Sequence, residues 1–164
     1  MRGGKVLSAL ILLVASAIGV VAFLYPFFST PDQALQSHGV AANAHANDAP
    51  LVLLILVVFC LGAVMSNLSS GAMNSKMIAV LGILVAMNAV LRVIPGPAGF
   101  SAIFMLPVLC GYAYGGTFGF LLGALSLMVS ALAGGGVGPW LPYQMLTAGW
   151  VGLSSSWLPE LRRL

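Results

Sequence analysis

Two polar residues interrupt the apolar stretch that follows Lys76, namely Asn88 and Arg92. They are four residues apart, a spacing that a helix presents on one face, so one ligand could contact both. An arginine at the centre of a membrane costs about 2.5–3.5 kcal/mol on insertion scales, whereas an arginine near a helix end reaches the interface at much lower cost. Arg92 is therefore interpreted either as an interface anchor or as a ligand contact.

Residues 134–145 hold the densest mixture of glycine, proline and aromatic residues in the chain. The glycines allow a loop to move, and Pro139 and Pro142 suit the first turn of a following helix. Trp140 and Tyr143 are typical of the membrane interface, where aromatic side chains gather. The same two rings could also stack on a ligand.

Uncharged polar residues extend both candidate regions. Gln144 and Thr147 lie close to one face of the last expected helix, and Ser126 and Ser130 share a face of the helix before it. These groups could exchange hydrogen bonds with water for hydrogen bonds with a small ligand. Hydrogen bonding between helices would also explain them.

Catalytic and metal-binding chemistry find little support. Ser101, Ser126 or Ser130 could act as a nucleophile, but an intramembrane enzyme also needs a base facing it across helices. Both histidines, His38 and His45, fall in a polar loop without the rigid spacing of a metal site. No glycine-rich phosphate loop ending in Lys-Ser or Lys-Thr is present, so no ATP site is expected. We predict neither an enzyme nor a metal or cofactor site.

The elements that must position these residues are membrane helices. The 164 residues are 60% hydrophobic and 5% charged, with a mean hydropathy of +1.08, which a soluble domain could not sustain. The few basic residues form no nucleic-acid stripe. Apolar runs, each close to the roughly 20 residues that span a bilayer, lie near 6–28, 50–66, 77–94, 98–114, 117–133 and 141–157. The prediction is an all-α, polytopic transmembrane bundle of about six spanning helices.

Basic residues set the expected orientation, because they favour the cytoplasmic side. They flank the first, third and sixth runs as Arg2, Lys5, Lys76, Arg162 and Arg163. Both termini are therefore predicted to be cytoplasmic, and the outer loops are 29–49, 92–99 and 134–139. The first run is interpreted as an uncleaved anchor, because its apolar core is long and the small-residue site lies well beyond it.

The polar segment Asn67–Ser75 is the predicted boundary between two parts of the chain. Residues 1–75 would form an N-terminal helical pair with the outer loop 29–49. Residues 76–164 would form a compact membrane core, because very short turns join its helices.

Small residues at four-residue spacing let helix backbones approach closely in a membrane. Gly119 and Gly123 are predicted to form such a packing face, with Gly115–Gly116 at the corner before it. Gly82 and Ala86 form a second small pair. This pair could dock a helix of the same chain, which is the preferred interpretation, or a helix of a partner subunit.

Several pieces of the segment from Lys76 to Trp157 stand out together: Asn88–Arg92, Gly99–Pro107, Gly119–Ala124, Gly138–Met145 and Gly149–Trp150. With these pieces the segment resembles the substrate-binding S components of energy-coupling factor (ECF) vitamin transporters, particularly a branch that includes cobalamin-type members. The resemblance implies a protein that captures a vitamin-like molecule outside a prokaryotic cell. It would then topple in the membrane when bound to a transmembrane coupling subunit driven by two ATPase subunits.

The resemblance also implies roles for particular positions. The first core helix of such proteins carries small residues for the coupling subunit, which Gly82 and Ala86 match in part, since alanine at both places is commoner. The family core has six helices and only four follow Lys76, so the core is expected to be truncated at its C-terminal end, with an extra helical pair in front. The expected substrate contacts are Asn88, Arg92, Ser101, Ser126, Ser130, Trp140, Tyr143, Gln144 and Thr147.

The predicted function is thus the substrate-binding component of an ECF transporter in a prokaryotic plasma membrane. A membrane scaffold or assembly subunit that uses its glycine faces only for packing is the main alternative, and an intramembrane enzyme is a weaker one. The scarcity of charge, with Arg92 as the sole cation of the spanning region, favours a neutral or anionic ligand with an apolar ring. Cobalamin, other vitamins and isoprenoid-like precursors remain open.

Overall fold

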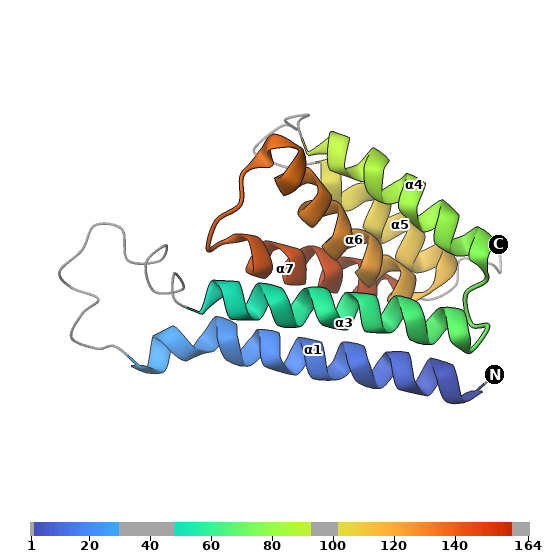
Figure 1. Cartoon of the computed structure of the whole chain (residues 1–164), viewed down its shortest axis with the longest axis horizontal. Coiled ribbons are helices and arrows are strands. Elements are labelled where there is room, and N and C mark those ends of the chain that lie inside the picture. Colours follow the sequence, from blue (N-terminus) through green and yellow to red (C-terminus); the bar gives the residue numbers. More distant parts are fainter. Residues whose placement is uncertain (1, 30–47, 93–101, 159–164) are drawn as a thin grey trace.

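The computed structural model of the chain describes residues 2–29, 48–92 and 102–158, and all of its secondary structure there is helical (Figure 1). The α-helices are α1 (Arg2–Ser29), α3 (Ala49–Ser69), α4 (Ser75–Leu91), α5 (Met105–Tyr114), α6 (Gly116–Ser130) and α7 (Leu141–Ser154). Three short segments adjoin them: the 3-10 helices η2 (Ala102–Phe104) and η4 (Ser155–Trp157), and the π-helical η3 (Ala131–Gly135). The predicted all-α bundle is confirmed.

Local sequence explains where several helices begin. Proline occupies the first turn of α3 and of α7, as Pro50 and Pro142, where its missing N–H costs no helical hydrogen bond. The side chain of Asn74 caps α4 by accepting a hydrogen bond from the Met77 backbone N–H at 2.8 Å. Gly115 has φ of 100°, which favours glycine, and it makes the corner between α5 and α6 as predicted.

Two described helices are long and apolar enough to cross a membrane: α3, and α6 continued by η3 (Gly116–Gly135). Shorter apolar helices occupy Ala9–Leu24, Ser75–Leu91 and Ala102–Tyr114. The predicted apolar runs therefore all carry helix in the structure. That each of them crosses the bilayer stays a prediction.

The helices α5, α6 and α7 pack with their backbones in close contact. A Cβ atom at Gly119 would lie 2.4 Å from the Gly152 carbonyl oxygen, and one at Gly123 would lie 2.3 Å from the Ala148 carbonyl oxygen. Only glycine fits at such distances, which confirms the predicted packing face of α6. Its partner is α7, which is also the helix that α6 contacts most extensively.

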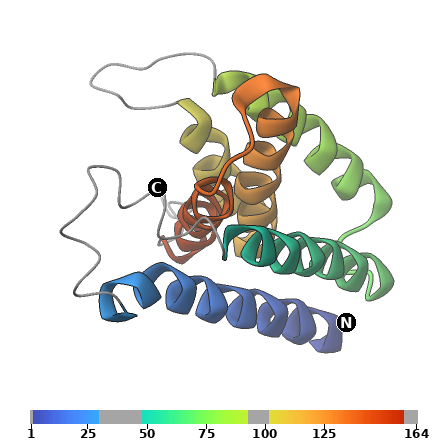
Figure 2. The same ribbon diagram turned by 60° about the vertical axis from the view of Figure 1, so that its left-hand side comes forward.

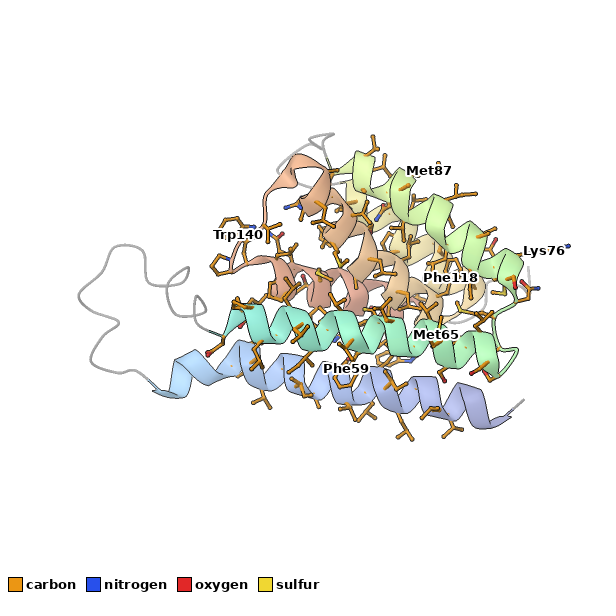
Figure 3. All side chains as sticks on the ribbon, in the orientation of Figure 1. Phe59, Met65, Lys76, Met87, Phe118 and Trp140 are labelled. Atoms are coloured by element: carbon orange, nitrogen blue, oxygen red, sulfur yellow. The ribbon has the colours of Figure 1, made fainter. Side chains whose placement is uncertain are left out.

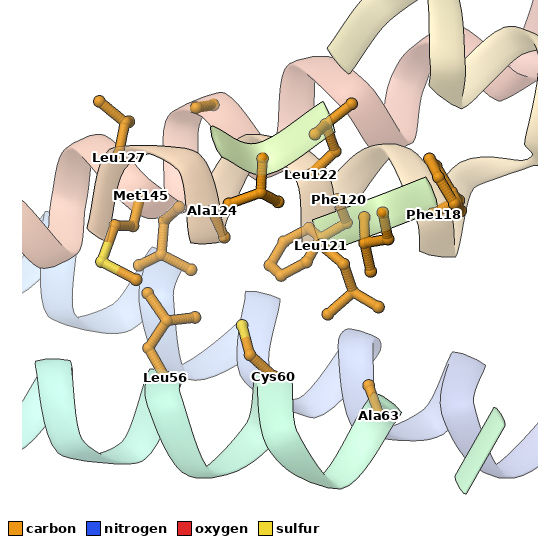
Figure 4. Packing of buried hydrophobic residues seen from close by; sticks show 14 of the residues in the cluster. Leu56, Cys60, Ala63, Phe118, Phe120, Leu121, Leu122, Ala124, Leu127 and Met145 are labelled. Atoms are coloured by element: carbon orange, nitrogen blue, oxygen red, sulfur yellow. The ribbon is translucent and has the colours of Figure 1, made fainter. Parts of the chain in front are cut away.

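The N-terminal pair shares the apolar core of the rest of the chain. Figures 1 and 2 show α1 and α3 side by side along one flank of the bundle, with α4 on the far side of α6. From α3, Leu56 and Cys60 point toward Phe120 and Met145, all of them buried (Figure 4). The predicted boundary near residue 75 falls at a turn between helices, and buried side chains from both sides of it belong to one cluster. That it separates two domains stays a prediction.

Large apolar side chains cover the outside of the bundle, as expected of a surface in contact with lipid. Met65 on α3 and Met87 on α4 are both more than half exposed (Figure 3). On α4, the exposed face also carries Ile83 and Val90, whereas Leu81 and Val85 are buried. One face of α4 therefore contacts the core. No described helix covers the other, here called the open face of α4, which consists of Gly82, Ile83, Ala86, Met87 and Val90.

Candidate functional site

Asn88 joins α4 to α6 inside the bundle. It is completely buried, and its Nδ2 donates a hydrogen bond to the Ser126 Oγ at 2.8 Å. The Ser126 hydroxyl in turn donates to the backbone carbonyl of Leu122, so it can only accept from the amide, which fixes the amide nitrogen toward Ser126. The Asn88 Oδ1 has no hydrogen-bond partner among the described residues.

Arg92 lies one turn further along α4 and reaches α7. Its Nη2 donates to the Gln144 Oε1 at 3.2 Å, across 52 residues of sequence. Its Nη1 is buried and has no hydrogen-bond partner in the part of the chain that the structure describes. Leaving a buried donor unpaired costs about 1–3 kcal/mol, and more for a charged group. The guanidinium group therefore has one bonded terminal nitrogen and one buried terminal nitrogen without a described partner.

The η3 segment covers the guanidinium. A Cβ atom at Gly135 would lie 3.1 Å from the Arg92 Nη1 and 2.8 Å from the Ser130 carbonyl oxygen. Gly134 and Gly136 on either side have φ of 120° and 84°, so this part of the backbone depends on glycine. Glycine here lets the charged group lie against backbone, whereas the sequence predicted only loop mobility for these glycines.

These contacts define one polar cluster at the end of the bundle where α4 and α6 finish and α7 begins, here called the Arg92 end. It consists of the hydrogen-bonded pairs Asn88–Ser126 and Arg92–Gln144, together with Ser130, which is included for its buried place on α6. Ser130 is buried one turn beyond Ser126 on the same face of α6, as predicted. The structure thus brings together five of the nine residues predicted to contact a ligand.

The other predicted contacts lie elsewhere or are already engaged. Tyr143 is buried and its ring meets Phe23 of α1 edge to face, with centroids 5.9 Å apart. The exposed Thr147 donates its hydroxyl to the Gln144 carbonyl at 2.9 Å. Trp140 is about half exposed at the start of α7 and lies beside Gly138 (Figure 3).

Some predictions fall on residues outside the described ranges. Ser101 and most of the predicted outer loop 92–99 are among them, and so are His38 and His45. Among the described residues, no three histidine, cysteine, aspartate or glutamate side chains gather where they could hold a metal ion.

Gly82 and Ala86 are both exposed on the open face of α4. No described atom lies within 4 Å of the place where a Cβ at Gly82 would stand. The preferred interpretation from the sequence, a contact with another helix of this chain, is therefore wrong in the part that the structure describes. Small residues at this spacing show that a face can be approached closely, but they do not say by which helix.

Two hollows lie along α1, and no residue of the polar cluster lines either of them. One, of about 570 Å³, is bordered by Ala17, Val21 and Leu51, and the other, of about 580 Å³, by Val20, Trp150 and Trp157. Their walls are almost entirely apolar and open to the side of the bundle. Such grooves suit lipid chains, whereas the polar cluster offers hydrogen bonds that can select a ligand.

Comparison with known proteins gives one match. The family model described as "ECF transporter, substrate-specific component" matches residues 76–163. No curated protein and no solved structure matches the chain. The matched region contains the whole polar cluster of the Arg92 end and the open face of α4, and it leaves out α1 and α3.

Proposed function

Because the chain belongs to the substrate-specific components of ECF transporters, we propose that it captures a vitamin-like small molecule at the outer face of a prokaryotic plasma membrane for ATP-driven uptake. The observation that carries this proposal is the polar cluster at the Arg92 end. It joins three helices of the family-matched region, and two of its buried polar atoms, the Asn88 Oδ1 and the Arg92 Nη1, have no partner among the described residues.

The position of the cluster supports capture from outside. Lys76 lies in the first turn of α4 and Arg92 directly follows its last residue, so the cytoplasmic bias of basic residues at the start of the core puts the Arg92 end on the outer side. The same rule gives cytoplasmic N- and C-termini and a multi-pass chain. A ligand entering from outside would meet the exposed glycine segment 134–136 before it met Asn88.

The open face of α4 supports a coupling role. Gly82 and Ala86 leave backbone accessible in the membrane, where close approach of helices is favourable. We assign this face to the transmembrane coupling subunit, which would act with two ATPase subunits. The sequence itself has no phosphate-binding loop, so the energy would come from those partners.

The cluster does not resemble a hydrolytic site. A serine nucleophile needs a base that can take its proton. The groups bonded to the Ser126 Oγ are an amide nitrogen and backbone carbonyls, and none of them is a base. Binding without bond cleavage is the chemistry that this arrangement favours.

The proposal is tested by purifying the chain from its native membrane in mild detergent and identifying the co-purified small molecules and proteins by mass spectrometry. We expect a small molecule together with a coupling subunit and two ATPases. Recovery of neither would contradict the proposal and favour the scaffold alternative.

A matched pair of variants separates binding from coupling. Gly82→Leu fills the open face of α4 and should lose the protein partners while keeping the small molecule. Gly62→Leu on α3 is the control, because a Cβ at Gly62 also meets no described atom within 4 Å. If both variants lose the protein partners equally, the assignment of the α4 face is wrong.

A further inference from the structure

Building on the proposed function, we infer that the ligand carries an oxyanion, a carboxylate or a phosphate, which binds the Arg92 guanidinium from the side of Nη1.

The Arg92 guanidinium has no acceptor of opposite charge among the described residues. Arg92 is positively charged at any physiological pH. Its described hydrogen-bond partner is the neutral Gln144 side chain at 3.2 Å, and Nη1 has no partner at all among the described residues. A cation held this way lacks the acceptor that buried or half-buried charges require.

Carboxylates that could neutralise Arg92 are scarce in this chain. The chain has three acidic residues in 164, and the segment 93–101 that follows Arg92 contains none. Asp48 is described at the start of α3, and the structure shows no hydrogen bond from Arg92 to it. The counter-charge that the guanidinium needs can therefore be supplied from outside the chain.

The buried side-chain amide of Asn88 lies one helical turn before Arg92. The Asn88 Oδ1 is an acceptor without a partner among the described residues, and Asn88 is completely buried on the same face of α4. A ligand that places an acceptor against Arg92 and a donor about one helical turn, roughly 5.4 Å, deeper would satisfy both atoms. Two independent polar atoms thus point to one ligand, acidic at its outer end.

Access to Nη1 requires the η3 segment to move, because that atom is buried against Gly135. Residues 133–137 are exposed, and the segment contains a break in helical geometry at Gly134. The hydrogen bond from Nη2 to Gln144 then holds α7 to α4, while the ligand approaches the other terminal nitrogen, Nη1.

The test uses the full chain in phosphatidylcholine nanodiscs and paired probes, of which one member carries an anionic group and the other is its neutral counterpart. The pairs are nicotinate with nicotinamide, biotin with biotinamide, and pyridoxal 5′-phosphate with pyridoxal. Affinity is measured by equilibrium binding, and molecules that co-purify from native membranes are identified in parallel. We expect the anionic member, or a co-purified acid, to bind the wild type at least about 10-fold more tightly than its neutral counterpart, equal to about 1.4 kcal/mol.

Variants locate the effect. Arg92→Gln should remove the preference for the anion, whereas Asn88→Ala should weaken both members of a pair without changing their ratio. Gln144→Ala keeps the guanidinium and should keep the preference. Unchanged helical circular dichroism of Arg92→Gln excludes unfolding as the cause of lost binding.

Three other outcomes would each overturn either the ligand assignment or the binding function. Binding or co-purification of a neutral molecule, or of an acid that Arg92→Gln binds equally well, refutes the oxyanion and leaves the proposed function standing. If phosphatidylglycerol in the nanodisc stabilises the chain through Arg92 and no soluble anion binds, the oxyanion is a lipid headgroup and the ligand assignment is wrong. If the wild type binds no probe and retains no small molecule, the binding function fails with it.

Discussion

Substituting Gly119 by alanine should destabilise the bundle, whereas the same change at Gly82 should not. A Cβ at Gly119 would stand 2.4 Å from the Gly152 carbonyl oxygen and 2.6 Å from the Gly111 Cα. Both are backbone atoms, so the clash cannot be relieved by rotating a side chain, and α5 or α7 must move away from α6. Overpacking of this kind costs about 1–3 kcal/mol.

At Gly82 the added methyl group meets no described atom within 4 Å. An alanine in an exposed helix position is about 0.8–1 kcal/mol more favourable than glycine. Both glycines lie inside helices, so this gain applies to both variants and cancels in their difference. The two variants should therefore differ in unfolding free energy by about 1–3 kcal/mol, which is the overpacking cost at Gly119.

The assay can use the two cysteines of the chain, Cys60 and Cys110, which are both buried and free. A dye that fluoresces on reaction with thiols reports unfolding as these side chains become accessible. We expect the melting temperature to fall for Gly119→Ala and to stay level or rise for Gly82→Ala. A Gly119→Ala protein that melts at or above the wild-type temperature would refute the close packing of α5, α6 and α7.

Three further changes test the polar contacts. Ser126→Ala should destabilise the bundle by about 1–3 kcal/mol in the same dye assay, because it leaves the buried Asn88 amide nitrogen unpaired. If a second change, Asn88→Leu, restores the stability, that cause is confirmed. No loss of stability in the single variant would contradict it. Gly135→Ala would place a methyl group 2.8 Å from the Ser130 carbonyl oxygen and 3.1 Å from the Arg92 Nη1. It should shift η3 and the guanidinium apart and weaken binding of the co-purified ligand, while the helical content stays constant. Unchanged binding would count against η3 as the cover of the candidate site. Trp150→Phe removes the indole N–H that bonds α7 to α1 and should cost about 0.5–1.5 kcal/mol; an unchanged melting temperature would show that this bond adds nothing to the docking of α1.

The positions of the helices could be predicted from sequence because apolar length and turn chemistry are local properties. The corner at Gly115 and the packing face of Gly119 and Gly123 follow from glycine spacing, and the structure has both. Asn88 and Arg92 share a face for the same reason, since a helix fixes the relation of residues four apart.

Partners across helices could not be predicted in the same way. The bonds from Asn88 to Ser126 and from Arg92 to Gln144 join residues 38 and 52 positions apart. Membrane helices are apolar all round, so their sequences do not fix how each helix is rotated against its neighbours. Tyr143 shows the consequence, because its ring faces Phe23 of α1, a residue that no local pattern connects with it.

The two faces of α4 allow the candidate ligand site and the proposed coupling surface to be altered separately. Asn88 and Arg92 point toward α6 and α7, whereas Gly82 and Ala86 lie on the open side of the same helix. The buried amide bond to Ser126 fixes the rotation of α4, because turning the helix would leave both polar groups without a partner in an apolar core. A variant that breaks this bond should therefore disturb both faces, while a change confined to the open face should leave the ligand site intact. That asymmetry follows from the geometry of a single helix and needs no movement of the rest of the bundle.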